Sequence, residues 1–332
     1  MTRFAINGFG RIGRLVMRVA REKKLNVVAI NDLSDTKTMA HLFKYDSLYG
    51  HYSEPISFDE NHLIVNKDRI KFFSEKNPIN LPWRKMQVDV VLECSGVFTD
   101  RVGLEKHLQA GAKRVILSAP GKGDDIPTYM LGVNQDKFNP NKDSIISNAS
   151  CTTNCLAPVA KIIHQELKIK KGFFTTVHAY TNDQKILDLG HKDLRRARAA
   201  ALSIIPTSTG AAKAIFEVIP ELEGRLDGLA FRVPTPTVSL VDLICQVEKK
   251  TTKNELNNLF EKASQGELKG ILQATHEELV SIDYKANPHS SIVDLALTMV
   301  IDDLIKVVAW YDNEWGYACR LVEMGEHVGE KI

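Results

Sequence analysis

RFAINGFGRIG, residues 3–13, decides the fold of the first half of the chain. Its first five residues form a short apolar run typical of a strand, and the residues from Arg11 to Lys23 have the pattern of a helix. Between them, residues 8–13 match the spacing G-x-G-x-x-G. At such a strand-to-helix turn, missing side chains let the backbone approach a pyrophosphate, and the helix N-terminus favours its negative charge. The stretch therefore predicts a dinucleotide site.

An acidic residue at the expected distance supports this interpretation. The next apolar run, residues 25–30, ends in Asn31-Asp32, and Asp32 lies 19 residues after Gly13. A carboxylate about 20 residues after the glycines hydrogen-bonds the ribose hydroxyls of NAD and would repel the 2′-phosphate of NADP. The alternative is a structural turn followed by a surface aspartate. The strand, glycines, helix and acid together favour the dinucleotide, with NAD as the cofactor.

Further apolar runs divide the chain into two parts. In the first part, runs at 88–93, 114–118 and 144–147 alternate with helical segments, which predicts βαβ units and a mostly parallel sheet. The second part has longer strand-like runs at 173–178, 229–233, 238–249, 295–301 and 305–311, and a helix at 253–265. We therefore expect an α/β protein: a Rossmann-type domain with a mostly parallel sheet, plus an α+β catalytic domain with one large sheet. The expected bounds are 1–149 and 150–314, with a C-terminal helix at about 315–332 returning to the first domain.

Composition excludes several classes of protein. The chain has 332 residues, of which 44% are hydrophobic and 25% charged, and a formal net charge of +2. Those values are ordinary for a globular protein and indicate neither a nucleic-acid nor a membrane partner. Five cysteines do not suggest a disulfide framework. There is no signal-peptide pattern and no apolar run of about 18 residues, so the expected location is cytoplasmic.

A candidate nucleophile lies in SNASCTTNC, residues 147–155. Ser150 is a suitable N-cap, which places Cys151 in the first turn of a helix. There the helix dipole would stabilise a thiolate and lower the pKa of the cysteine. A lone cysteine is more often a small buried apolar residue, which is our interpretation of Cys94, Cys245 and Cys319. Cys155 follows four residues after Cys151, but no second pair has zinc-like spacing, so we expect no metal.

His178 is a candidate base for this nucleophile. It ends the strand-like run 173–178, and a histidine can take up and return a proton near neutral pH. From spacing alone, a surface or capping role for His178 is equally open.

Seven segments together resemble the phosphorylating glyceraldehyde-3-phosphate dehydrogenases. They occur in the family's order and cover nearly the whole chain: INGFGRIGR, SNASCTTNCLAPVAK, HAYTNDQ, HKDLRRARAA, IIPTSTGAAKA, RVPTPTVSLVDL and WYDNEWGY. The resemblance implies oxidation and phosphorylation of D-glyceraldehyde 3-phosphate to 1,3-bisphosphoglycerate with NAD and inorganic phosphate, through a thiohemiacetal and a thioester on Cys151. It also implies a homotetramer in which the loop 185–201 lines a subunit interface.

The resemblance assigns roles to matched positions. Cys151 and His178 would be the catalytic pair. Cofactor contacts would come from the glycine-rich turn and four further positions: Gly8, Gly10, Arg11, Ile12, Gly13, Asp32, Lys76, Ser118 and Asn313. The substrate phosphate and inorganic phosphate would be held by Ser150, Thr152, Thr181, Arg196, Thr209, Gly210 and Arg232. Without the resemblance, the cluster of Arg196 with its neighbours Arg195 and Arg198 is equally typical of a solvated charged surface.

Two alternatives and one departure from the family pattern stay open. The chain could be an erythrose-4-phosphate dehydrogenase, or a non-catalytic NAD-binding redox sensor with an oxidisable thiol. The loop before Arg195 reads Asp-Leu-Gly-His-Lys-Asp, residues 188–193, where many NAD-specific relatives have proline in place of Gly190. We therefore expect a preference for NAD with some tolerance of NADP.

Overall fold

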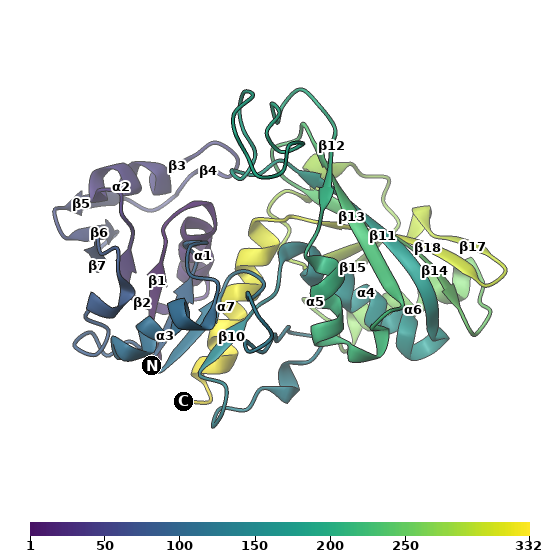
Figure 1. Cartoon of the computed structure of the whole chain (residues 1–332), viewed down its shortest axis with the longest axis horizontal. Coiled ribbons are helices and arrows are strands. Elements are labelled where there is room, and N and C mark those ends of the chain that lie inside the picture. The colour runs from purple at the N-terminus through teal and green to yellow at the C-terminus, as the bar shows by residue number, and fades with distance from the viewer. The chain divides into compact units, whose positions relative to one another are not determined.

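The computed structural model describes all 332 residues, which fall into two compact units. Unit 1 comprises residues 1–129, 136–149 and 318–332, and unit 2 comprises residues 130–135 and 150–317. Helix α7 (Trp315–Gly329) begins in unit 2 and continues in unit 1 from Ala318. The colour ramp of Figure 1 follows the chain through both units.

Unit 1 is built on an eight-stranded sheet in the order β10-β9-β8-β1-β2-β7-β6-β5. The six strands from β10 to β7 are parallel, and the sheet continues with β6 antiparallel to β7 and β5 antiparallel to β6. The strands are β1 (Arg3–Asn7), β2 (Asn26–Asn31), β5 (Ile56–Asp59), β6 (His62–Val65), β7 (Asp68–Phe73), β8 (Val90–Glu93), β9 (Arg114–Leu117) and β10 (Ile145–Ser147). A small separate ribbon joins β3 (Tyr45–Asp46) and β4 (Gly50–His51), and the helices are α1 (Arg11–Glu22), α2 (Thr36–Lys44) and α3 (Arg101–Gln109).

The order of these strands creates a crevice between β1 and β8. From β1 the chain proceeds to β2 and β7 on one side, whereas β8, β9 and β10 follow on the other side. β8 is buried along its whole length, as its continuous apolar run Val90–Leu92 requires. In open α/β sheets, ligands bind outside the carboxyl ends of the strands where the strand order reverses. The crevice therefore lies above Asn7, at the end of β1, and Glu93, at the end of β8.

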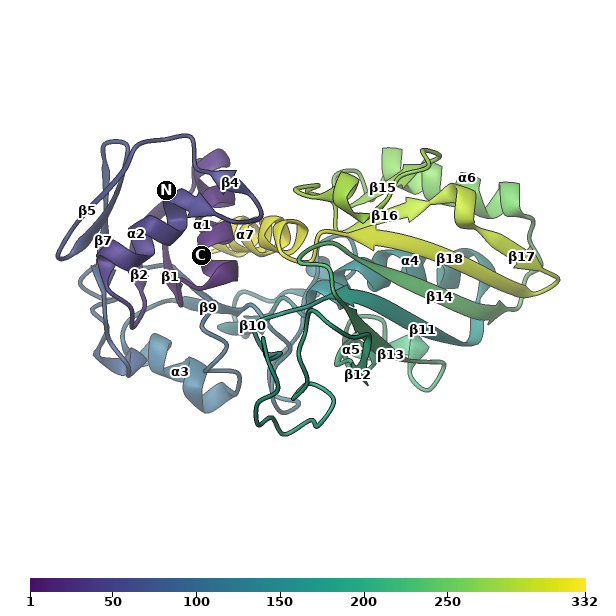
Figure 2. The same ribbon diagram turned by 90° about the horizontal axis from the view of Figure 1, so that it is seen from above.

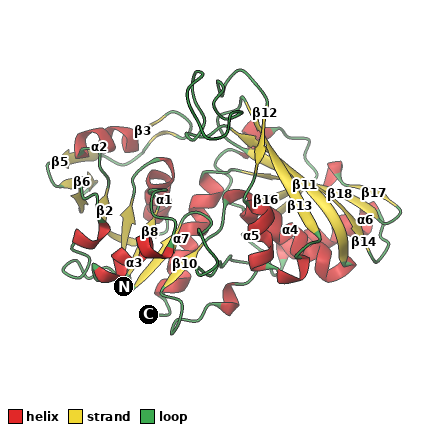
Figure 3. Cartoon of the chain, viewed as in Figure 1, coloured by secondary structure: helices red, strands yellow, loops and turns green.

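Unit 2 contains one large mixed sheet in the order β12-β13-β11-β14-β18-β16-β15, with β17 paired to β18. Its strands are β11 (Ile169–Ala179), β12 (Ile205–Ser208), β13 (Leu226–Val233), β14 (Ser239–Val247), β15 (Leu272–Thr275), β16 (Ser291–Asp294), β17 (Met299–Ile301) and β18 (Leu304–Tyr311). Helices α4 (Cys151–Leu167), α5 (Ala211–Val218) and α6 (Lys253–Gln265) contact these strands. They lie on one side of the sheet, as Figures 2 and 3 show, while residues such as Phe173 and Ile244 leave apolar side chains exposed.

The expected fold class is confirmed, with one local difference. Residues 295–301 were expected to form a strand, but only Met299–Ile301 does so, and Leu295–Leu297 forms a 3-10 turn. Side chains of α6 explain the turn: the Asn257 amide donates to the Leu295 carbonyl, and the Lys253 ammonium group donates to the Ala296 carbonyl. These carbonyls therefore need no neighbouring strand. None of the helices combines the length and apolar character that crossing a membrane would require.

Candidate active site

The glycine-rich turn of unit 1 has two glycines that the fold itself requires. A Cβ on Gly8, where φ is +87°, would lie 2.4 Å from the Cα of Ser95. A Cβ on Gly13 would lie 2.0 Å from the carbonyl oxygen of Gly8. A Cβ on Gly10 would meet nothing within 4 Å. The first and third glycines thus allow close packing within the turn, whereas the second leaves open space in front of the helix α1 N-terminus.

A pocket of about 360 Å³ adjoins this turn. Asp32 and Lys76 line it, from the segments that follow β2 and β7. The Asp32 carboxylate accepts the backbone N–H groups of Phe9 (2.7 Å) and Ser34 (2.9 Å), so it is fixed toward the turn. The Arg11 side chain forms an ion pair with Asp46 (2.6 Å). An anion at this helix N-terminus would therefore be bound by the backbone of the first turn, near Arg11 and Ile12. The pocket, the open position at Gly10 and the carboxylate fit a dinucleotide.

The nucleophile candidate in unit 2 is the first residue of helix α4. The Ser150 hydroxyl caps this helix by accepting the backbone N–H of Thr153. Capping fixes the first turn, and Cys151 Sγ then lies 3.5 Å from Nε2 of His178. This distance allows the imidazole to accept the thiol proton, so the structure brings the two predicted catalytic residues together.

Strand register places an arginine beside His178. His178 on β11 is directly opposite Arg232 on the parallel neighbour β13. Arg232 Nη1 lies 2.8 Å from His178 Nδ1, 3.0 Å from the Ala179 carbonyl oxygen and 3.5 Å from the Thr181 hydroxyl. His178 Nδ1 also lies 2.7 Å from that carbonyl oxygen. Arg232 can only donate and the Ala179 carbonyl can only accept, so with the ring proton on Nδ1 given to Ala179, Arg232 donates to that carbonyl and not to Nδ1, and Nε2 can accept from Cys151.

Burial and charge determine the protonation of this pair. Burial, followed by the charge of Arg232, lowers the pKa of His178 to about 3, so the ring is neutral near pH 7. Burial raises the pKa of the Cys151 thiol, while the charge of Arg232 and hydrogen bonds from Thr152 act in the opposite direction. The sequence-based expectation of a lowered pKa considered only the helix N-terminus, whereas desolvation of the sulfur is the larger effect here. The imidazole is therefore in the neutral form that can accept a proton, and burial also keeps the sulfur as a thiol in the free chain.

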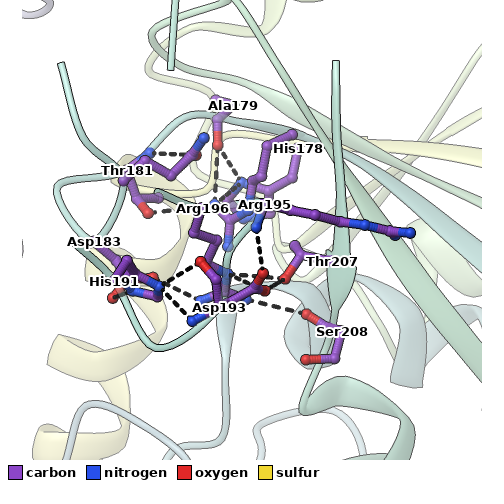
Figure 4. Close-up of polar contacts among 12 residues, drawn as sticks. His178, Ala179, Thr181, Asp183, His191, Asp193, Arg195, Arg196, Thr207 and Ser208 are labelled. Carbon is purple, nitrogen blue, oxygen red and sulfur yellow. Dashed lines mark hydrogen bonds and ion pairs between the residues drawn. The ribbon is translucent and has the colours of Figure 1, made fainter. Parts of the chain in front are cut away.

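Arg196 is held in a cluster of polar side chains, drawn in Figure 4. Its Nη1 pairs with Asp183 (2.6 Å), its Nε donates to the Thr207 hydroxyl (2.8 Å), and its Nη2 donates to the Ser208 carbonyl (3.2 Å). Thr207 in turn donates to Asp193 (2.8 Å). Neighbouring arginines differ: Arg198 is exposed and pairs with exposed Asp188, and Arg195 points away from the cluster in Figure 4. Of the three, only Arg196 is oriented by a shell of fixed partners.

The other predicted positions have distinct surroundings. Thr209 and Gly210 precede helix α5, and Gly210 is its N-cap, a position at which backbone N–H groups can bind an anion. The Thr152 hydroxyl is buried 2.9 Å from the Tyr311 hydroxyl, and it also hydrogen-bonds the Cys151 side chain. Asn313 accepts from the Ser239 hydroxyl (3.1 Å), which orients its amide. Ser118, in unit 1, follows β9, and its backbone N–H donates to the Glu93 carbonyl.

Several residues that support the site were not predicted from the sequence. The Tyr311 hydroxyl joins Thr152 and Thr176, each at 2.9 Å, and its ring meets the His178 ring edge-on at 6.0 Å. Asp183 and Asp193 orient Arg196. The available signal for Tyr311 was its place in WYDNEWGY, two residues before Asn313. The structure contains no group of three or more His, Cys, Asp or Glu residues arranged to hold a metal ion.

Comparisons with known proteins cover both units. Residues 2–101 match the family model described as glyceraldehyde 3-phosphate dehydrogenase, NAD binding domain, and residues 150–313 match that of its C-terminal domain. The chain is 55% identical to glyceraldehyde-3-phosphate dehydrogenase of Geobacillus stearothermophilus over 98% of both chains. It is 54% identical to glyceraldehyde-3-phosphate dehydrogenase 2 of Synechocystis over 99% of both, and 52% identical to the chloroplastic A form of Chlamydomonas reinhardtii over 99% of this chain and 89% of the relative.

Proposed function

Because the chain belongs to the glyceraldehyde 3-phosphate dehydrogenase family, we propose that it oxidises and phosphorylates D-glyceraldehyde 3-phosphate to 1,3-bisphosphoglycerate with NAD and inorganic phosphate. The observation that carries the proposal is the contact between Cys151 Sγ and His178 Nε2, with Arg232 beside it. That arrangement combines a nucleophile, a base and a cation suited to a phosphate group.

NAD fits the residues of unit 1. The backbone of the glycine-rich turn at Gly10, Arg11 and Ile12 would hold the pyrophosphate, Asp32 the adenine ribose, and Lys76 lines the surrounding pocket. Ser118 does not line that pocket but hydrogen-bonds Cys94, which does, and we propose it as a further contact. Asn313 of unit 2, oriented by Ser239, would hold the nicotinamide carboxamide. When bound, NAD supplies the hydride acceptor for the oxidation.

The chemistry of the chain's own residues centres on the sulfur. Cys151 Sγ attacks the aldehyde carbon while His178 Nε2 takes the thiol proton and passes it to the former carbonyl oxygen, which gives a thiohemiacetal on Sγ. His178 Nε2 then takes that hydroxyl proton as the carbon loses a hydride to the bound acceptor, and a thioester remains on Sγ. Inorganic phosphate attacks the thioester carbon, the C–S bond breaks, and the acyl phosphate leaves. A covalent thioester keeps the energy of oxidation that hydrolysis would release.

The cations of unit 2 would bind the two phosphate groups. Arg232 and Thr181 adjoin His178, and Arg196 lies in its own polar shell. The α5 N-terminus at Thr209 and Gly210, and the helix cap Ser150, add hydroxyl and backbone donors. Thr152, whose hydroxyl lies against Tyr311, would add hydrogen-bond donors beside the sulfur.

The test is an assay of NADH formation with the wild-type chain and Cys151→Ser. The wild type should form NADH from glyceraldehyde 3-phosphate in a phosphate-dependent reaction. Cys151→Ser should lose this activity while still binding NAD, because Cys151 is not among the residues proposed to hold the cofactor and the change replaces only the sulfur atom. Full activity in Cys151→Ser would refute the mechanism, and absence of activity in the wild type would favour the redox sensor. Erythrose 4-phosphate and NADP, assayed in parallel, test the remaining alternatives.

We also propose a homotetramer. An apolar groove of about 1020 Å³ is lined by residues of β11, β14 and α5, among them Phe173, Ile244 and Phe216. The loop 185–201 exposes further large apolar side chains, among them Ile186 and Leu194. Exposed apolar surfaces of this kind are typical of protein interfaces.

The five free cysteines suit a reducing compartment such as the cytoplasm.

A further inference from the structure

A buried carboxylate beneath the pocket of unit 1 has no role in the proposed chemistry. Glu93 is the last residue of β8 and is completely buried. Its carboxylate accepts from the Asn7 amide (2.5 Å), the His107 ring Nε2 (2.9 Å), and both the backbone N–H (2.8 Å) and the hydroxyl (2.5 Å) of Ser95. These donors come from β1, from α3 and from the segment after β8. Four donors from three parts of the fold thus converge on one side chain.

The hydrogen-bond pattern fixes the form of each group. The Trp83 indole can only donate, and it donates to Nδ1 of His107 (3.0 Å), so the ring proton of the neutral histidine is on Nε2 and points to Glu93. The Ser95 hydroxyl accepts the Val97 backbone N–H (3.1 Å), so its own proton is directed to Glu93. The Asn7 amide, the His107 ring N–H and the Ser95 backbone N–H can only donate, so the Glu93 carboxyl group accepts at least three of its four hydrogen bonds.

Stability alone is a weak explanation for this arrangement. Burying a carboxylate is costly, and apolar side chains of similar volume often stabilise a fold at least as well. Four donors that converge on one carboxyl group do, however, fix the positions of the groups that donate. His107 itself is fully buried between Trp83 and Glu93, with its ring stacked on the indole, so it has one available orientation.

The groups held by Glu93 are the two sides of the crevice between β1 and β8. Asn7 ends β1 and directly precedes Gly8, and its amide oxygen also accepts from Asn31 (2.7 Å), the residue before Asp32. Ser95 is the residue against which Gly8 packs so closely that a Cβ there would lie 2.4 Å away. Asn7, Gly8 and Ser95 all line the pocket of about 360 Å³. A shift of the Glu93 carboxylate would therefore move both the glycine-rich turn and the opposite side of the pocket.

We propose that Glu93 and His107 are positioning residues for the dinucleotide: His107 orients the Glu93 carboxylate, which holds Asn7 and Ser95 at the spacing that NAD binding requires. The inference rests on the proposed NAD site of unit 1. Neither residue lines the pocket, so both act through the groups that they hold.

The test compares variants at His107 by direct titration with NAD and by steady-state kinetics. His107→Leu removes the donor to Glu93, and the dissociation constant and KM for NAD should each rise up to about ten-fold, the range of losing one hydrogen bond. At saturating NAD, kcat should be unchanged, and so should the rate at which iodoacetamide alkylates Cys151 in unit 2. His107→Gln, which keeps an amide donor for Glu93, should recover most of the NAD affinity. If His107→Leu does not fold, Glu93→Gln provides the same comparison at unchanged side-chain size.

Leu104→Ala is the matched control. Leu104 is also fully buried on α3, one turn before His107, and belongs to an apolar cluster with Val115 and Leu117. It should lower thermal stability without changing NAD affinity. If Leu104→Ala weakens NAD binding as much as His107→Leu, the effect is general loosening of unit 1 and the inference is wrong. Unchanged NAD affinity in His107→Leu would also overturn it, whereas a wild-type chain that binds no NAD would instead refute the proposed function.

Discussion

His178 is held neutral by its surroundings, and the cost of that state should appear in the pH dependence of stability. Its pKa in the folded chain is about 3, against an ordinary value of 6.5, because of burial and the charge of Arg232. Below pH 6.5 the unfolded chain binds a proton at His178 that the folded chain does not bind. The contribution of His178 to the free energy of unfolding is therefore complete above pH 6.5 and is lost as the pH falls toward 3.

The measurement is urea unfolding of the wild type and His178→Asn between pH 7.5 and 4, a range set by the ordinary pKa of about 6.5 for histidine. The difference in unfolding free energy between the two chains should shift with pH, with the wild type losing more stability on acidification. A difference that stays constant across this range would show that His178 is not buried in its neutral form. The same variant should lower kcat by about 10²- to 10⁴-fold, the usual contribution of a positioned base.

Single residues could be predicted from the sequence more readily than their partners. Cys151 is identified by its place after an N-cap, and Asp32 by its distance from the glycines. The contact of His178 with Arg232 depends on the register of β11 and β13, which are 54 residues apart in sequence at this point. The orientation of Arg196 depends on a loop whose hydrogen bonds have no sequence period. Local patterns therefore predict candidates, and pairing between distant strands creates the site.

At the scale of elements, the turn between β1 and α1 contains one glycine that the fold requires, Gly13, and one that only a ligand would require, Gly10. Gly13→Ala places a Cβ 2.0 Å from the Gly8 carbonyl oxygen, so it should lower the melting temperature markedly. Gly10→Ala meets nothing within 4 Å, so it should leave stability within about 1 kcal/mol of the wild type, the usual cost of changing an N-cap. If the turn binds a pyrophosphate, Gly10→Ala should nevertheless raise KM for NAD. Calorimetry and kinetics on the two variants check this, and an unchanged KM in Gly10→Ala would place the cofactor elsewhere.

Elements whose ends are marked by capping residues in the sequence were predicted best. Helix α6 spans Lys253–Gln265, as expected, because Thr252 and Glu255 form a capping box that fixes its start. The apolar run 295–301 has no capping residues to mark its ends. The backbone carbonyls of its first half accept from side chains of α6, so that half does not pair as a strand. The antiparallel strands β5 and β6 were not predicted, since their residues are only partly apolar and lie at a sheet edge. Hydrophobic periodicity and capping residues are local features of the sequence, whereas the turn at 295–297 and the strands β5 and β6 depend on tertiary contacts.

At the scale of the whole molecule, the two sheets follow from two different patterns along the chain. Alternation of strands and helices gives the mostly parallel sheet of unit 1, and longer consecutive strands give the mixed sheet of unit 2. The segment Met130–Gln135, which belongs to unit 2 although unit 1 residues flank it on both sides, has no signal in the sequence. Lys161 on α4 donates to the Gly132 carbonyl (2.9 Å), a contact that only the folded chain creates.

The last prediction concerns assembly of the chain through the exposed apolar surface of the unit 2 sheet. Phe173 is 73% exposed on β11 and lines the apolar groove, so Phe173→Glu should not disturb the folding of unit 2. If that face is an interface between copies of the chain, a buried carboxylate there is costly, and the tetramer should dissociate to smaller species in sedimentation velocity. Phe58→Glu, at an exposed phenylalanine on β5 of unit 1, is the matched control and should keep the wild-type mass. A tetrameric wild type with a tetrameric Phe173→Glu would place the interface on another surface, such as the loop 185–201, and a monomeric wild type would refute the proposed assembly.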